Sequence, residues 1–567
     1  MKGGRQQTAT TGYLWVALAA LAIAVGTAVA YYPAVHAGYV WDDDFYVTRN
    51  TLLTAPDGLR RIWFSLDSPS QYFPLVYTTF RLERAIWGLD PRGYHIANIL
   101  LHIANALLVW LVLSRLSAKG AWLAAAIFAV HPVHVESVAW ITERKNVLSL
   151  FFSLLTMLAW LAYIDCDDRR SIRWWFFAFV FYVLALFSKT TAVTLPAAML
   201  IVIWIKRLPI DRRRILAIVP FVVWGVLMGI VTVLWERYHQ GTMGPEFAMS
   251  PLERVLVASR ALWFYAGKLA WPWKLAFSYG KWSVSQADPV WYVWLAGLIA
   301  VGIAMYVWRA RIGRRVAAAV LFFVITPIPL LGFFSLYTFR YSYVADHYQY
   351  VASIGLIAIA AGAMSAAVGR FGKTAAVIPA AVLVALGLLT WRQCLVYKDA
   401  ETLWRDTLAK TPSSAIAHTN LGRILLEQGQ PDEAFSHFRE AAGIAFDMPE
   451  VQNNLGVALF SKGDLRGAER CFRRAIRSDP RYADPHVNLA GVYLRQERFV
   501  AAEREARAAL RINPYLTQAR SNLGIALAEQ GRLDEAIEQL RKALSLDPAD
   551  EQSRRNLEHA LSLRRVR

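Results

Sequence analysis

Long runs of apolar residues fill the first 392 positions, and each run is close to the length that crosses a lipid bilayer. The first covers about residues 13–32, and its length favours a retained helix over a cleaved signal peptide, although residues 28–30 resemble a cleavage site. Ten further runs begin near His95, Ala121, Val147, Arg173, Thr191, Ile215, Pro289, Val316, Tyr348 and Thr374. The pattern predicts about eleven spans, or twelve if the less apolar run 254–271 also crosses.

Lys and Arg residues gather in alternate loops between these runs. Residues 1–392 hold 35 Lys and Arg against 18 Asp and Glu, whereas residues 393–567 hold 26 against 24. Because short basic loops mark the cytoplasmic side, we expect the N-terminus there and the long loop 33–94 on the opposite side. The chain is then a multi-pass protein of the inner (cytoplasmic) membrane, and its C-terminal domain lies on the extracytoplasmic, periplasmic side.

A repeat of 34 residues occupies the C-terminal part. The pair Asn-Leu recurs at this spacing, and so do two alanine positions and a closing proline. The asparagines are Asn420, Asn454, Asn488, Asn522 and Asn556. This period with small and prolyl positions is typical of tetratricopeptide repeats, whose helix pairs stack into a solenoid. The repeats predict a surface that binds protein or peptide; the asparagines could face that groove or support helix packing.

The composition excludes several classes of protein. Hydrophobic types make up 56% of the residues and charged types 18%, with a mean hydropathy of +0.32, which excludes a purely soluble enzyme. The basic excess lies in the apolar part and forms no stripe of the nucleic-acid-binding kind, so we expect no nucleic-acid partner. Three separated cysteines predict neither a disulfide framework nor a cysteine-rich zinc site.

Three clusters of polar residues lie in loops assigned to the outer side. The first is the acidic run Asp42, Asp43 and Asp44, directly after the first span. Like charges beside a membrane are unfavourable unless a cation or a donor offsets them, so this run indicates a functional site more strongly than a solvated loop.

The second cluster contains His131, His134 and Glu136, followed by Arg144 and Lys145. Two histidines and a glutamate can bind zinc or manganese, but their spacing is not that of the helical metalloprotease motif. We therefore assign no metal ligand, although a divalent cation remains open, and expect the two cations to bind an anion such as phosphate.

The third cluster contains Asp346, His347 and Tyr348. An interfacial belt of aromatic residues would explain the tyrosines of this segment, but not the acid beside the histidine. The three clusters would then lie on one face of the membrane. They would bring together acids that accept a proton, cations that bind phosphate and helices that bind a lipid tail. This combination predicts transfer from a lipid-phosphate donor to an external acceptor.

The chain resembles the transmembrane O-mannosyltransferases with tetratricopeptide repeats, which use polyprenyl-phosphate sugars and have the GT-C fold. The matching stretches are YVWDD at 39–43, YFPLV at 72–76, GLDPRGYH at 88–95, NILLH at 98–102 and HPVHVESVA at 131–139. The resemblance implies that Asp42 and Asp43 are the catalytic acids and that Arg144 lies near the donor phosphate. The family often has Gly and Asp flanking that arginine, where this chain has Glu143 and Asn146.

The resemblance also concerns the third cluster, where the family often has Arg-Tyr and this chain has His347-Tyr348. With Arg144 and Lys145, we assign donor-phosphate or substrate contacts to His131, His134, Glu136, Asp346, His347 and Tyr348. Either Asp42 or Asp43 would accept the proton of the acceptor hydroxyl, and the anomeric centre would invert.

The predicted architecture is all-α: a GT-C-like membrane domain over 1–392, a connecting helix over 393–414 and repeats over 415–567. The predicted function is transfer of a sugar from a polyprenyl-phosphate donor to an acceptor such as a Ser or Thr of a protein. Two alternatives remain: a transferase that moves a whole glycan, and a non-enzymatic membrane scaffold that acts through its repeats.

Overall fold

The computed structural model of the chain describes residues 3–65, 71–166, 171–242 and 247–566. Within these ranges the regular structure is entirely helical, without strands, as the hydrophobic pattern predicts. The chain forms two compact units, Met1–Thr411 and Pro412–Arg567. Residues 66–70 of the predicted outer loop lie outside the described part.

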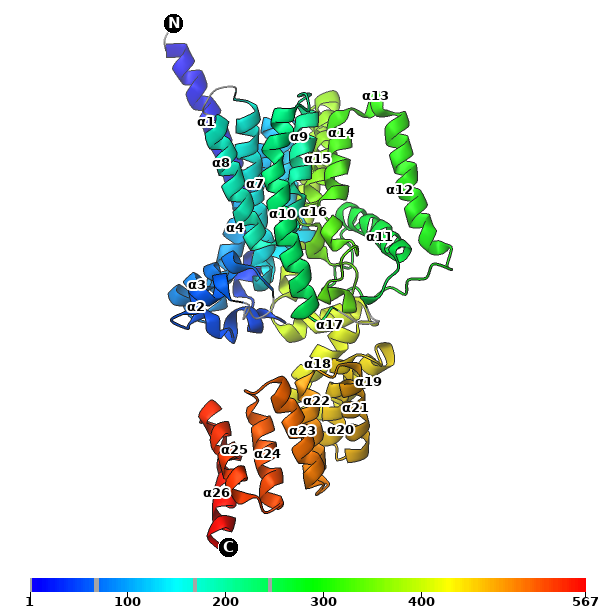
Figure 1. The fold of residues 1–567 in the computed structure, drawn as a ribbon. Helices are drawn as coiled ribbons and strands as arrows, with labels where there is room; N and C mark the ends of the chain where they lie inside the picture. The colour runs from blue at the N-terminus through cyan, green and yellow to red at the C-terminus, as the bar shows by residue number, and fades with distance from the viewer. Residues whose placement is uncertain (1–2, 66–70, 167–170, 243–246, 567) are drawn as a thin grey trace. The chain divides into compact units, whose positions relative to one another are not determined.

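Long apolar helices lie side by side in the first unit (Figure 1). In the described ranges, eight helical stretches are long and apolar enough to cross a membrane. They are residues Tyr13–Ala30 of α1 (Gly3–Ala30), α4 (Pro91–Arg115), Ile141–Ile164 around α7 (Arg144–Ile164), α8 (Ser171–Ser188), α10 (Arg212–Tyr238), α12 (Val290–Val307), α15 (Ser353–Phe371), and Thr374–Val396 around α16 (Val377–Val396). The helices α5 (Ala121–Val130) and α6 (Val135–Ala139), bent by 53° around Pro132, would make nine as one broken span.

The number of candidate spans in the described ranges is therefore smaller than the eleven we expected. The run near Thr191 forms a 3-10 turn and then the short helix α9 (Leu195–Ile205), and the run near Val316 forms only α14 (Arg314–Ile325). Pro327 follows α14 closely, and the residue before a proline disfavours helix. Both short helices lie alongside the long ones (Figure 1). The less apolar run forms α11 (Pro251–Ala270), which is not among the candidate spans.

The segment between α1 and α4 folds onto the ends of α4 and α7. It contains α2 (Gly58–Phe64), α3 (Pro74–Trp87) and short helical turns at Tyr32–His36, Asp44–Thr48 and Thr51–Leu53. Tyr46, Tyr77 and Phe80 are buried in one cluster with Tyr94 of α4 and Ile141. The acidic run is thereby held against the beginning of α7.

The region around the α5–α6 bend is the most buried part of the first unit, since every residue of 123–150 is buried. Short turns at Pro132–His134 and Ile141–Glu143 join α5, α6 and α7. Pro132 disfavours a continuous helix at this point. The remaining helices of the unit are α13 (Arg309–Ile312) and α17 (Ala400–Lys410), with short turns at Thr190–Thr194, Ile328–Leu330, Tyr337–Arg340, Asp346–Gln349 and Lys373–Ala376.

The second unit consists of four stacked helix pairs and a final helix, as the 34-residue period predicts. The pairs are α18 (Ala415–Glu427) with α19 (Pro431–Ile444), α20 (Pro449–Ser461) with α21 (Leu465–Ser478), α22 (Ala483–Arg495) with α23 (Phe499–Ile512), and α24 (Thr517–Glu529) with α25 (Leu533–Leu546); α26 (Glu551–Val566) follows. Gly422 and Gly456 lie directly against the rings of Phe438 and Phe472, where a Cβ atom would collide.

Two of the recurrent asparagines make hydrogen bonds that bear on their expected roles. The Asn488 amide donates to Asn453 Oδ1 at 2.9 Å, and the Asn522 amide donates to the Val487 carbonyl at 3.0 Å. Both bonds join one repeat to the repeat before it. At these two positions the asparagines support the stacking of repeats.

Candidate active site

Asp42 and Asp43 differ sharply in their hydrogen bonds. Asp43 is fully buried, and its carboxylate accepts hydrogen bonds from the Val40 amide at 2.8 Å, the Thr142 amide at 2.9 Å and the Thr142 hydroxyl at 2.6 Å. Burial raises the pKa of Asp43 to about 7, while these bonds oppose the rise. Asp43 therefore fastens the acidic run to the turn that precedes α7.

Asp42 is half-buried, and its Oδ1 atom is shielded from solvent without a hydrogen-bond partner among the described residues. Burial raises the pKa of Asp42 to about 6, and the nearby Lys145 ammonium opposes the rise. This carboxylate has an unused acceptor atom and titrates close to neutral pH, as a general base requires.

Glu143 is the centre of a buried group of charges. Its Oε1 lies 2.9 Å from Lys145 Nζ, and its Oε2 lies 3.4 Å from Lys189 Nζ. Lys189 also donates to Asn146 Oδ1 at 2.7 Å. Burial lowers the pKa of Lys189, which lies between α8 and the next turn, to about 8, while Glu143 opposes the fall. Two cations thus lie around one carboxylate and would attract a further anion.

His347 joins the third sequence cluster to this group. Its Nδ1 lies 3.0 Å from Glu136 Oε1, and its Nε2 lies 3.8 Å from Glu143 Oε1. Its backbone amide donates to Glu136 Oε2 at 2.9 Å. Since Glu143, Lys145 and His347 all act electrostatically on Asp42, parts of the three predicted clusters meet at one place.

The neighbours of His347 have local partners. Asp346 accepts hydrogen bonds from the Tyr279 hydroxyl at 2.9 and 2.8 Å to its two oxygens. Burial raises the pKa of Asp346, and the nearby Glu136 carboxylate adds to the rise. The Tyr348 hydroxyl shares a short hydrogen bond with the Thr338 hydroxyl. These contacts hold Asp346 and Tyr348 in place but do not test their roles toward substrate, which stay predictions.

The Arg144 guanidinium donates hydrogen bonds from all three of its nitrogen atoms to other protein groups. Its sequence neighbour Lys145, in contrast, lies beside Asp42. The NH1 and NH2 groups of Arg144 donate to the two Glu83 oxygens at 2.5 and 3.2 Å, NH2 also donates to the Tyr94 carbonyl at 3.1 Å, and Nε donates to Asn98. Arg144 is 1% exposed. These contacts make it a link between α3, α4 and α7, and leave little capacity for a donor phosphate.

The two histidines of the second cluster also bind protein groups. His131 Nε2 lies 3.1 Å from the Leu269 carbonyl oxygen, and His134 lies 2.8 Å from the Phe128 carbonyl oxygen and 3.0 Å from the Ser353 hydroxyl. They stabilise the α5–α6 bend. In the described part of the chain, no group of three or more His, Cys, Asp or Glu side chains is arranged to hold a metal ion.

Sequence reasoning missed several side chains of this group, above all Lys189, Thr142 and Glu83. Lys189 lies 44 positions after Lys145, at the end of an apolar helix, and no recognisable sequence motif surrounds it. A cation at the end of a span, outside the short basic loops, was the available signal. Glu83 is an acid on a half-buried helix, which only its partner Arg144 explains.

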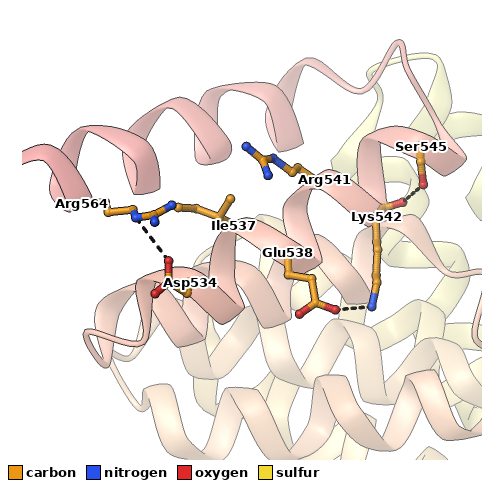
Figure 2. Close-up of a pocket in the computed structure, with 7 residues that line it drawn as sticks. All are labelled: Asp534, Ile537, Glu538, Arg541, Lys542, Ser545 and Arg564. Carbon is orange, nitrogen blue, oxygen red and sulfur yellow. Dashed lines mark hydrogen bonds and ion pairs between the residues drawn. The ribbon is translucent and has the colours of Figure 1, made fainter.

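The second unit carries a separate groove of about 410 Å³ on α25 and α26. Figure 2 shows Arg541 extending between the two helices, whereas Asp534 pairs with Arg564 at 3.3 Å and Glu538 pairs with Lys542. Among the described residues, Arg541 has no hydrogen-bond or ion-pair partner. The groove therefore offers one unpaired cation to a bound carboxylate.

Family comparisons match both parts of the chain. Residues 68–235 match the family described as dolichyl-phosphate-mannose-protein mannosyltransferase, and residues 396–449, 453–516 and 517–550 match tetratricopeptide repeats. The chain is 26% identical over 482 residues to protein O-mannosyl-transferase TMTC4 of Mus musculus, which covers 71% of this chain and 63% of that protein. It is 25% identical over 505 residues to TMTC1 of Homo sapiens, covering 77% and 56%.

The predicted resemblance is confirmed: the chain is homologous to these proteins over most of its length. It spans about three fifths of the length of the curated relatives it matches. Among solved structures, a crystal structure of YrrB, described as a tetratricopeptide protein with an unusual peptide-binding site, matches with a TM-score of 0.26 and 21% identity, covering 30% of this chain and 87% of that one.

Proposed function

We propose that this chain, a homologue of the protein O-mannosyl-transferases, is a membrane glycosyltransferase that moves a sugar from a polyprenyl-phosphate donor to a Ser or Thr hydroxyl of a protein. The observation that carries the proposal is the Asp42 carboxylate, which has a free acceptor atom beside the cation Lys145. A base next to a phosphate-binding cation suits an acceptor hydroxyl that attacks a sugar phosphate.

Asp42, rather than Asp43, is the proposed base. The hydroxyl oxygen of the acceptor forms a bond to the anomeric carbon while the bond from that carbon to the phosphate oxygen breaks, and the hydroxyl proton passes to Asp42. Asp43 already accepts three hydrogen bonds and positions the base. Attack opposite the leaving phosphate inverts the anomeric centre.

Lys145 and Lys189 are the proposed cations for the leaving phosphate. Lys145 and Lys189 are two ammonium groups around the single Glu143 carboxylate, and their N–H groups can stabilise the charge that grows on the departing oxygen. We transfer this role from Arg144, because Glu83, Asn98 and the Tyr94 carbonyl already accept its hydrogen bonds. His347, whose Nδ1 contacts Glu136, is the proposed third contact of the phosphate or sugar.

The proposed topology places the acidic run and the repeats outside the cytoplasm. The basic short loops support this orientation. Nine or eleven spans would put the two ends of the membrane part on opposite sides, as this topology requires, whereas eight spans would put them on the same side. The repeats would bind the acceptor protein or a partner, because stacked helix pairs present extended surfaces for peptide.

The test is transfer of labelled mannose from a synthetic polyprenyl-phosphate mannose to a Ser/Thr peptide by purified protein. Asp42→Asn should reduce kcat by about 10²–10⁴-fold, the usual contribution of a general base. Asp44→Asn is the matched control, because Asp44 belongs to the same run but its side-chain partners in the described part of the chain, Thr48 and Arg49, belong to its own loop. Equal activity of Asp42→Asn and Asp44→Asn would refute the proposed base.

A further inference from the structure

Arg260 packs against the rings of two tryptophans that lie side by side, 6.1 Å apart between ring centres. Its guanidinium carbon is 4.2 Å from the centre of the Trp282 ring and 4.8 Å from that of Trp291. Among the described residues, no hydrogen bond or ion pair engages it. Cation–π contacts stabilise the charge of the guanidinium but accept no conventional hydrogen bond from its five N–H donors. These donors are therefore available to an acceptor.

A cavity of about 300 Å³ opens beside this guanidinium. Arg260, Trp263, Phe264, Tyr279, Trp282 and Trp294 line it. Five of the six are aromatic, and no carboxylate is among them. Lys268 lies over the neighbouring Phe264 and Tyr279 rings, but its ammonium donates to the Trp273 and Lys274 carbonyls at 2.7 and 3.0 Å. The cavity thus combines apolar walls with a single positive charge.

The cavity lies where α12 begins, at one end of a candidate span. Trp291 and Trp294 belong to the first turns of that helix, and its side chains Val290 and Val293 are 63% and 64% exposed. Exposed aliphatic side chains on such a helix face hydrocarbon, and tryptophans gather where hydrocarbon meets water. Arg260 is therefore at the level of lipid headgroups.

We infer that Arg260 and these aromatic side chains form a binding site for the phosphate of an anionic membrane phospholipid. A guanidinium binds phosphate oxygens with two parallel hydrogen bonds, and the rings would pack against the glycerol and the first acyl carbons. Because the lining has a cation and no acid, it disfavours the ammonium of a zwitterionic headgroup. None of Asp42, Lys145 and Lys189 lines the cavity. Tyr279 of the lining donates to Asp346, so the cavity adjoins the proposed donor site without containing its base or its two cations.

The test measures lipid retention by the full-length protein. Protein purified from nanodiscs of phosphatidylcholine, with or without one fifth phosphatidylglycerol, is analysed by native mass spectrometry. We expect selective retention of phosphatidylglycerol, reduced about tenfold by Arg260→Gln, which corresponds to about 1.4 kcal/mol. Arg311→Gln is the matched control, since Arg311 is an exposed cation just past the other end of α12 and has no polar partner among the described residues.

Two more variants keep the test decisive. Arg260→Lys keeps the charge but loses the paired N–H groups, so we expect intermediate retention even if Arg260→Gln does not fold. Trp282→Leu removes one of the two rings that contact Arg260, without changing the charge, and should also lower retention. Equal retention by wild type and both Arg260 variants would overturn the site. Equal binding of phosphatidylcholine, or displacement of phosphatidylglycerol by an acidic peptide, would overturn the assignment to an anionic lipid.

Discussion

The buried pair of Glu83 and Arg144 predicts that Glu83→Gln destabilises the protein without weakening donor binding. Two N–H groups of Arg144 reach the two oxygens of Glu83 at 2.5 and 3.2 Å, and the side chains are 2% and 10% exposed. Removing one partner of a buried pair leaves the other charge uncompensated, and typically lowers stability by about 3–5 kcal/mol. The expected loss lies at the upper end of what single substitutions produce.

An exposed ion pair supplies the matched control. Glu401 lies 2.8 Å from Arg405 on α17, where the two side chains are 33% and 46% exposed. Such pairs contribute about 0.2–1 kcal/mol, so Glu401→Gln should hardly change stability. The double variant Glu83→Gln with Arg144→Gln removes both buried charges, and we expect it to be less destabilised than the two single variants predict together.

Thermal unfolding in detergent, followed by size exclusion of the remaining folded protein, measures the stability of the four variants. The KM for the polyprenyl-phosphate donor is measured on the same preparations. A structural role predicts a lowered thermal midpoint for Glu83→Gln and an unchanged donor KM. An unchanged midpoint with a donor KM raised tenfold would refute this reasoning, and would return Arg144 to the phosphate-binding role that its sequence motif indicates.

Three further predictions concern the proposed reaction and the boundary of the first unit. The rate should rise with pH through about 6, because Asp42 must lose its proton to act as a base, and fall above about 8 as Lys189 loses its charge; a pH–rate profile measures both limbs. Lys189→Met should raise the donor KM, whereas Lys189→Arg should keep donor binding and move the alkaline limb to higher pH; identical profiles for both would contradict a role for this cation. A chain ending at Thr411 keeps the whole first unit and should still bind donor. A chain ending at Tyr397 lacks Trp404 and should unfold more easily. The Trp404 ring lies 5.3 Å from the Phe277 ring and 6.3 Å from the Trp41 ring, measured between ring centres. Equal thermal midpoints for the two truncated chains would show that α17 does not stabilise this unit.

Local patterns in the sequence determined the helical architecture. A repeat of 34 residues predicts stacked helix pairs, because each unit can bury its apolar face only against its neighbours. Apolar runs of bilayer length likewise predict spans, since hydrocarbon leaves the backbone no other partner than itself. The lengths of the helices near Thr191 and Val316 could not be predicted from the apolar runs, because proline and local turns shorten a helix without changing the mean hydropathy of the run.

Only the tertiary structure decided which polar side chains meet. Asp42 and Asp43 are adjacent acids in the sequence, yet Thr142, 99 residues further on, donates two hydrogen bonds to Asp43, whereas Asp42 Oδ1 has no partner among the described residues. Arg144 and Lys145 are adjacent cations, but they lie in different surroundings, one against Glu83 and the other against Glu143. The physical reason is that burial makes each charge depend on its nearest partner, and folding chooses that partner from segments far apart in the chain.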